Sequence, residues 1–108
     1  MKSASETLTP VVLELGGKDA AIIFEDCDYK ATLDFCLRAA FQNSGQNCAG
    51  LERMIVHEKI YDKLVKDVGK IVSEMKQGAP LSGVVDVAAM TMKAQVRDLV
   101  STAIKANQ

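Results

Sequence analysis

The stretch VVLELGGKDAAIIF, residues 11–24, decides the fold class of this 108-residue chain. Residues 11–15 form a β-prone apolar run that two glycines close, so we expect a buried strand that ends in a tight turn. Residues 20–24 form a second short apolar strand. Asp26 or Asp28 then stands where it can cap a following helix.

A helix and a third strand are expected next. From residue 29 to residue 43 the apolar positions match one helical face, and Ser44-Gly45 breaks the pattern; these positions are Leu33, Cys36, Leu37, Ala40 and Phe41. Residues 51–56 read as a strand. Strands that alternate with helices predict an α/β fold, here a three-layer αβα fragment with a short, mainly parallel sheet.

The second half of the chain is expected to form two helices separated by an irregular segment. An amphipathic pattern starts at residue 57 and is stopped by Gly78 and Pro80. The last helix is expected from Thr91 to Gln108. Three strands are few for a self-sufficient sheet, and the last helix runs to the end of the sequence, so we expect a piece of a larger domain.

Charge, apolar runs and cysteine content limit the classes of binding partner and the cellular compartment that we expect. Lys and Arg total 13 against 14 Asp and Glu, and the net charge of −1 favours neither nucleic acid nor anionic lipid. No apolar run is long enough for a membrane span, and the N-terminus lacks the apolar region of a signal peptide. Three cysteines without a CxxC pair predict reduced thiols and no zinc or other metal site. We therefore expect an intracellular, cytoplasmic chain, with an organellar or membrane-associated parent protein left open.

Cys48 is the strongest candidate for chemistry. It stands in a short Gly-flanked loop between a helix and a strand, where a thiol is exposed and backbone N–H groups can form an oxyanion site. A buried structural cysteine is the alternative, and on context alone it is the more common case. Cys36 lies on the apolar helix face and Cys27 at a strand-to-helix junction, so both are interpreted as structural.

Glu14 is the candidate base. A carboxylate at the C-terminal end of an apolar strand is costly unless it is paired or functional, and desolvation there would raise its pKa. A solvent-facing Glu at a strand end is the alternative. His57, the only histidine, reads as a surface residue, and Gly16-Gly17 match no phosphate-binding motif.

Two segments carry a family resemblance. Residues 13–18, LELGGK, and residues 45–50, GQNCAG, resemble the paired active-site signatures of the aldehyde dehydrogenase superfamily. Glu14 and Cys48 are 34 residues apart, as that family requires. The likeness extends through Thr9-Pro10-Val11-Val12 and residues 56–62 and covers nearly the whole chain.

The resemblance implies a mechanism. Cys48 would attack an aldehyde to form a thiohemiacetal, hydride would pass to NAD or NADP, and Glu14 would activate water to release the acid from the thioester. Members that transfer the acyl group to coenzyme A generally lack this Glu, so the resemblance implies the non-acylating, NAD(P)-dependent branch.

The resemblance also implies what this chain lacks. Residues 1–15 would be the C-terminal edge of the cofactor-binding domain, and residues 16–108 the first part of the catalytic domain. Only Leu15 and Gly16 would approach the cofactor. The oxyanion-hole Asn would lie upstream and the ribose-binding Glu downstream, so we expect the isolated chain to be inactive. The parent would be a homo-oligomer that acts on a small aldehyde.

Two other functions stay open. The chain can be a non-catalytic module that self-associates through its amphipathic helices and thin sheet. It can also be an unrelated thiol enzyme in which His57 activates Cys48. The second idea requires the two side chains to meet, although residues 51–56 in extended form would span about 20 Å.

Overall fold

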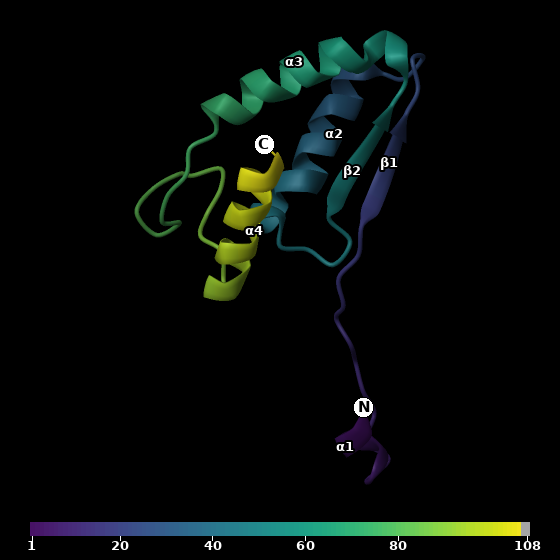
Figure 1. Cartoon of the computed structure of the whole chain (residues 1–108), viewed down its shortest axis with the longest axis vertical. Helices are drawn as coiled ribbons and strands as arrows, with labels where there is room; N and C mark the ends of the chain where they lie inside the picture. The colour runs from purple at the N-terminus through teal and green to yellow at the C-terminus, as the bar shows by residue number, and fades with distance from the viewer. Residues whose placement is uncertain (107–108) are drawn as a thin grey trace.

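The computed structural model describes residues 1–106 (Figure 1). The part of the predicted last helix that reaches Gln108 lies outside these residues. In chain order the elements are α1 (Lys2–Ser5), β1 (Asp19–Ile23), α2 (Tyr29–Phe41), the 3-10 helix η1 (Gln42–Gly45), β2 (Leu51–Val56), α3 (Glu58–Glu74) and α4 (Lys93–Ala106). The α/β class is confirmed.

The sheet has two parallel strands, β1 and β2, joined through α2. Ile22 pairs with Ile55 and Ile23 with Val56, while the register shifts between Asp19 and Ala20. Because side chains alternate along a strand, Ile23 and Val56 face the helices and Ile22 and Ile55 face away from them.

The core lies between the sheet and the helices α2 and α3. Ile23, Cys36 and Leu64 form its centre, one residue from each element. Leu33 and Leu37 of α2 are buried as well. The predicted apolar face of α2 is therefore confirmed, but the five buried hydrophobic side chains found among the described residues make a small core for a chain of this length.

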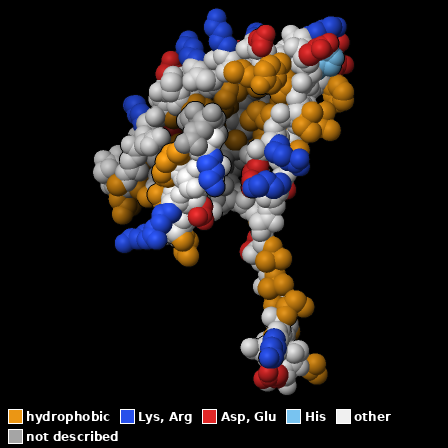
Figure 2. All heavy atoms as spheres, viewed as in Figure 1, with side chains coloured by type: hydrophobic (Ala, Val, Ile, Leu, Met, Phe, Trp, Pro, Cys, Tyr) orange, Lys and Arg blue, Asp and Glu red, His pale blue; other side chains and the backbone are white. Residues whose placement is uncertain are grey.

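The predicted strand over residues 11–15 is wrong. Residues 9–18 form an irregular arm that carries α1 away from the body (Figure 1). Figure 2 shows hydrophobic side chains along this arm, and Val12 is 91% exposed. A strand needs a hydrogen-bonded neighbour, and within residues 1–106 no segment pairs with residues 11–15: the sheet contains only β1 and β2, and the one isolated bridge joins Gln77 and Val87. The arm raises the radius of gyration to 17.7 Å, against about 13 Å for a compact chain of 100 residues.

The predicted three layers are reduced to two. The core helices cover only one face of the sheet, and the other face carries Ile22 and Ile55, which are 65% and 53% exposed. Phe24, just after β1, is exposed as well. Within residues 1–106 no element covers this apolar face, because the expected third strand and a second helical layer did not form.

The helix ends follow local hydrogen bonds. Asp28 caps α2 by accepting from the Ala31 N–H at 3.2 Å, which confirms one of the two predicted caps. α3 ends at Glu74, before the predicted stop at Gly78 and Pro80. Met75, the residue after the helix, has an extended backbone. The N–H of Lys76 then donates to the Asp86 carboxylate at 2.9 Å instead of continuing the helix.

α4 begins two residues after the predicted start at Thr91. Its helically spaced apolar side chains do not pack, since Val96, Leu99, Val100 and Ile104 are each more than 40% exposed. Among the described residues, no helix has the length and apolar character that crossing a bilayer demands.

Candidate active site

A cleft of about 430 Å³ brings the two predicted catalytic residues together. Glu14 reaches it from the arm, and Cys48 reaches it from the loop that precedes β2. Leu15 and Gly16, the predicted cofactor-side residues, line the same cleft. Other parts of its wall are Gly45, Gln46, Asn47, Glu52 and Gln95.

The loop that carries Cys48, residues 43–50, is called the Cys48 loop below. It opens with three residues in the left-handed region, Asn43 (φ 52°), Ser44 (φ 59°) and Gly45 (φ 74°). The Asn47 side chain donates to the Gln42 carbonyl at 2.8 Å and fixes the middle of the loop. Cys48 is exposed, so its interpretation as a buried structural thiol is wrong.

The start of β2 holds the arm beside the Cys48 loop. The Arg53 Nε–H donates to the Lys18 carbonyl at 2.9 Å, and the Lys18 ammonium forms an ion pair with Glu52. A Cβ placed on Gly17 would lie 3.3 Å from the Cys48 carbonyl oxygen, so the two backbones approach closely here. Residues 14–17 are thereby positioned next to the thiol.

Glu14 determines the electrostatics of the thiol. Its hydrogen bond with the Cys48 thiol, and then its negative charge, raise the pKa of Cys48. The backbone N–H groups of Ala49 and Cys48 lower that pKa but do not outweigh the carboxylate. Glu14 itself is exposed, so the predicted desolvation in an apolar strand is absent.

A second cleft, of about 450 Å³, reaches Cys48 from the other side. Phe35, Arg38 and Ala39 of α2 line it together with Gln42, Asn47 and Ala49. Sequence reasoning missed this cleft and also missed Gln95. The helical spacing of Phe35, Arg38 and Gln42, on the side of α2 away from its core face, is the signal that could have indicated a wall of the site.

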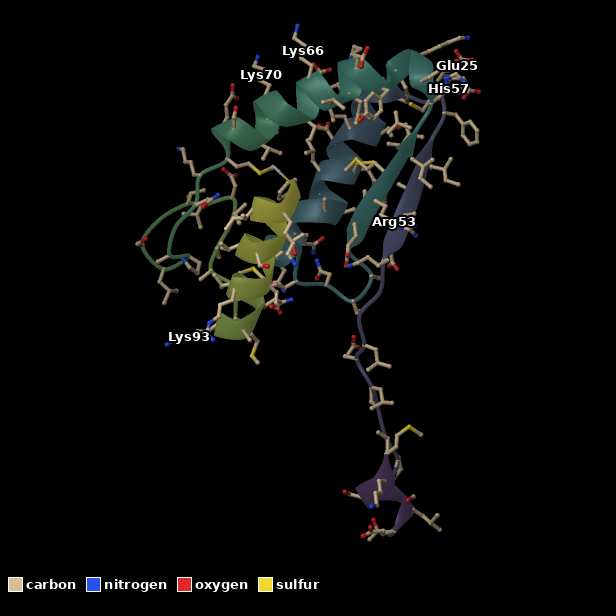
Figure 3. All side chains as sticks on the ribbon, in the orientation of Figure 1. Glu25, Arg53, His57, Lys66, Lys70 and Lys93 are labelled. Carbon is tan, nitrogen blue, oxygen red and sulfur yellow. The ribbon has the colours of Figure 1, made fainter. Side chains whose placement is uncertain are left out.

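His57 does not reach the thiol. It caps α3, and its Nδ1 accepts from the Lys59 N–H at 3.3 Å. Figure 3 shows His57 beside Glu25 where α3 begins, with Arg53 farther back along β2 toward the Cys48 loop. The whole of β2 separates His57 from that loop, about 20 Å of extended chain. The Cys48–His57 pair is therefore not formed.

The other two cysteines are structural, as predicted. Cys36 is 2% exposed at the centre of the core, and half-buried Cys27 packs against it. Burial raises the pKa of the Cys36 thiol, which keeps it protonated and unreactive.

The cleft wall beside Gly16 leaves room for a flat ring, such as the nicotinamide that the family resemblance implies. The space beside Gly16 is open, since a Cβ built there would meet no atom within 4 Å, so a flat ring can approach this backbone. A dinucleotide also needs a site for its phosphates. Residues 1–108 contain neither of the two glycine-rich phosphate motifs, GxGxxG and GxxxxGKS/T.

Comparisons with known proteins agree on one family. The model of the aldehyde dehydrogenase family matches residues 1–108. The 2-aminomuconic 6-semialdehyde dehydrogenase of a Pseudomonas species is 42% identical over 80 residues, which are 74% of this chain and 16% of that protein.

Solved structures give the same result. An aldehyde dehydrogenase from Bartonella henselae superimposes with a TM-score of 0.80 at 39% identity, over 97% of this chain and 22% of that one. The aldehyde dehydrogenase of Bacillus cereus, solved as an NAD⁺ complex, gives a TM-score of 0.77 at 32% identity, over 87% of this chain and 19% of that one.

The chain therefore spans about a fifth of the length of these relatives. The match includes both segments that line the cleft, since the family model extends over the whole sequence. This chain belongs to the aldehyde dehydrogenase family.

Proposed function

We propose that this chain is the part of an NAD(P)-dependent aldehyde dehydrogenase that supplies the nucleophile, Cys48, and the base, Glu14, for oxidation of an aldehyde to a carboxylic acid. The observation that carries the proposal is the shared cleft, in which these two side chains from distant segments meet. A thiol beside a carboxylate at a surface cleft suits a two-step reaction through a covalent intermediate.

In the first step the Cys48 thiolate attacks the aldehyde carbon. A C–S bond forms, and the carbonyl electron pair moves to the oxygen. The backbone N–H groups of Cys48 and Ala49 favour negative charge at this position, as their effect on the thiol pKa indicates. The product of the attack is a thiohemiacetal.

Leu15 and Gly16 would lie against the nicotinamide of NAD or NADP, which would accept the hydride from the carbon bonded to Cys48, leaving a thioester. Glu14 then takes a proton from a water molecule, whose oxygen attacks the thioester carbon. The C–S bond breaks, the acid leaves, and Cys48 is released as thiolate. Because Glu14 and Cys48 line the same cleft, this carboxylate is placed to act on a water molecule at that carbon.

We also propose that this chain contributes to two domains of a larger enzyme. We assign residues 1–15 to the edge of a cofactor-binding domain and residues 16–108 to a catalytic domain. The arm that separates α1 from the body is consistent with this boundary. Leu15 and Gly16 would meet the reacting ring of the cofactor, and the remaining cofactor contacts would come from outside residues 1–108.

Competition with alkylation tests the nucleophile. A small aliphatic aldehyde should slow iodoacetamide labelling of Cys48, because the thiohemiacetal removes the free thiolate, and should change labelling of Cys27 much less. Peptide mass spectrometry gives both rates from one sample, and Cys48→Ser confirms the assigned peptide. Equal labelling of Cys48 with and without aldehyde contradicts the proposal.

The isolated chain should not turn over aldehyde with NAD⁺. Losing a single oxyanion donor typically lowers a rate by about 10²–10³, and here most of the cofactor contacts are missing as well. The measurement is NADH absorbance with purified chain. A steady signal that Cys48→Ser abolishes would overturn this expectation.

A second function rests on the uncovered sheet face. Ile22, Phe24 and Ile55 are all more than half exposed on one side of the two strands. An apolar surface of this kind is typical of an interface. We propose that the isolated chain self-associates through this face, and that in the parent enzyme the face packs against other parts of a homo-oligomeric protein.

A further inference from the structure

Residues 88–91, just before α4, are hydrogen-bonded to the Cys48 loop by two side chains. Ser44 Oγ accepts from the Ala88 N–H at 3.0 Å and donates to the Ala88 carbonyl at 3.1 Å. Gln46 Oε1 accepts from the Thr91 N–H at 2.8 Å, and Gln46 Nε2 donates to the Ala89 carbonyl at 3.4 Å. Ser44 and Gln46 are both half-buried. These four bonds are called the clasp.

The clasp acts on a strained backbone. Asn43 and Ser44 are non-glycine residues with φ near +55°, a conformation that L-residues rarely adopt and that persists only where the surroundings enforce it. Gln46 Nε2 also donates to the Asn43 carbonyl at 3.1 Å, so one side chain bridges the strained turn and the segment beyond it. The turn, residues 43–45, ends three positions before Cys48 and belongs to the same loop.

We propose that Ser44 and Gln46 are positioning residues that keep Cys48 beside Glu14 by bonding the Cys48 loop to residues 88–91. The inference rests on the proposed function, because it concerns the same nucleophile and base. It adds that residues 88–91, 40 to 43 positions after the thiol, are required for the geometry of the site. The same bonds bring Gln95, in the first turn of α4, to the cleft wall.

A purely structural role for the clasp makes a different prediction. In that case Gln46→Ala would loosen residues 88–91 but leave the thiol and the carboxylate together. The two roles are separated by the coupling between Glu14 and Cys48, which exists only while the loop holds its conformation. Other charged groups near the thiol are Glu52, which is paired with Lys18, and Arg38 in the second cleft; all variants below retain them.

The test is a double-mutant cycle on the pH dependence of Cys48 alkylation. In the wild-type chain, Glu14→Gln removes the carboxylate that raises the thiol pKa, so the apparent pKa of Cys48 should fall. In the Gln46→Ala background the same substitution should lower the pKa by less than about half as much. Gln77→Ala, an exposed glutamine outside the clasp, is the matched control and should leave the full shift.

An equal Glu14→Gln shift in the wild-type and Gln46→Ala backgrounds overturns the clasp as a positioning device. No shift in the wild-type chain would instead contradict the Glu14–Cys48 pair, and with it both proposals. Slow labelling of buried Cys36 reports an intact fold in each variant. If Gln46→Ala loses that protection, Ser44→Gly replaces it, because glycine removes the hydroxyl bonds while tolerating the left-handed backbone, and it should reduce the coupling equally.

Discussion

Glu14 and Cys48 are 34 residues apart in the sequence, and their side chains meet in one cleft. The carboxylate has a cost for the nucleophile, because its hydrogen-bonding effect and negative charge raise the pKa of the Cys48 thiol. The backbone N–H groups of Cys48 and Ala49 act in the opposite direction. The balance between the two effects determines how much thiolate is present near neutral pH.

Gly17 sets how closely the arm approaches this thiol. An added Cβ would lie 2.7 Å from the Asp19 carboxylate, which can rotate away, and 3.3 Å from the Cys48 carbonyl, which cannot. Gly17→Ala should therefore push the arm and the Cys48 loop apart and lower the pKa of Cys48, measured by thiolate absorbance against pH. Gly16→Ala meets no atom within 4 Å and is the control; an unchanged titration in both variants would contradict the close approach.

The roles of some single residues could be predicted well from the sequence. Asp28 caps α2 and Cys36 is buried because the few neighbouring residues in the sequence decide both outcomes. Exposure of Cys48 was not decided locally, since the same loop could have been covered by a distant segment. Gln95 reaches the cleft only through the path of residues 88–92, which no local pattern encodes.

At the level of elements, α2 and α3 are joined by a polar contact outside the core. The Tyr29 hydroxyl donates to Asp67 at 2.7 Å, and the Lys63 ammonium donates to the same carboxylate at 3.0 Å while lying 3.2 Å from the centre of the Tyr29 ring. The hydrogen bond from Tyr29, then that from Lys63, lowers the pKa of Asp67.

This contact predicts that the free energy of unfolding decreases at acidic pH. The folded-state pKa of Asp67 is depressed, so its stabilisation is present above the ordinary Asp pKa of about 3.9 and is lost as pH falls toward the lowered value. Asp67→Asn should remove that pH dependence, and Tyr29→Phe should cost up to about 1 kcal/mol near neutral pH. Urea unfolding at several pH values measures both, with exposed Tyr61→Phe as control; identical curves for Tyr29→Phe and Tyr61→Phe would contradict the contact.

Helices were predicted better than strands for a physical reason. A helix satisfies its backbone hydrogen bonds within the segment, so the periodicity of α2 and α3 was sufficient to identify them. A strand needs a partner. Residues 11–15 have the composition of a strand, but no described segment pairs with them, and they remain an exposed arm.

At the scale of the whole molecule, the uncovered sheet face is the main departure from the predicted layers. Family members contain about five times as many residues as this chain, which is consistent with a face that other segments cover in them. The sequence predicts that the strands are apolar on both sides. It does not reveal whether this chain also contains the helices that would cover the second face of the sheet.

The uncovered face predicts self-association of the isolated chain. The wild-type chain should show a weight-average mass above that of a monomer in light scattering, rising with concentration, because burying Ile22 and Ile55 removes apolar surface from water. Ile55→Lys should lower that mass, whereas Val84→Lys, at a 94% exposed loop position, should not. A wild-type chain that stays monomeric and binds no apolar dye would contradict the prediction.

The central claim, that Cys48 attacks and Glu14 activates water, is tested most directly by the lifetime of an acylated Cys48. An activated ester such as p-nitrophenyl acetate places an acyl group on the thiol without any cofactor, and intact-mass spectrometry follows its loss. We predict one acyl group per chain, absent in Cys48→Ser, that is lost about tenfold or more slowly in Glu14→Gln, because a positioned general base contributes about 10²–10⁴ in a closed site and less in this open cleft. Glu74→Gln, at the end of α3 and not among the residues that line either cleft, should match the wild-type chain. Equal lifetimes in the wild-type and Glu14→Gln chains, or acylation that survives Cys48→Ser, would contradict the claim.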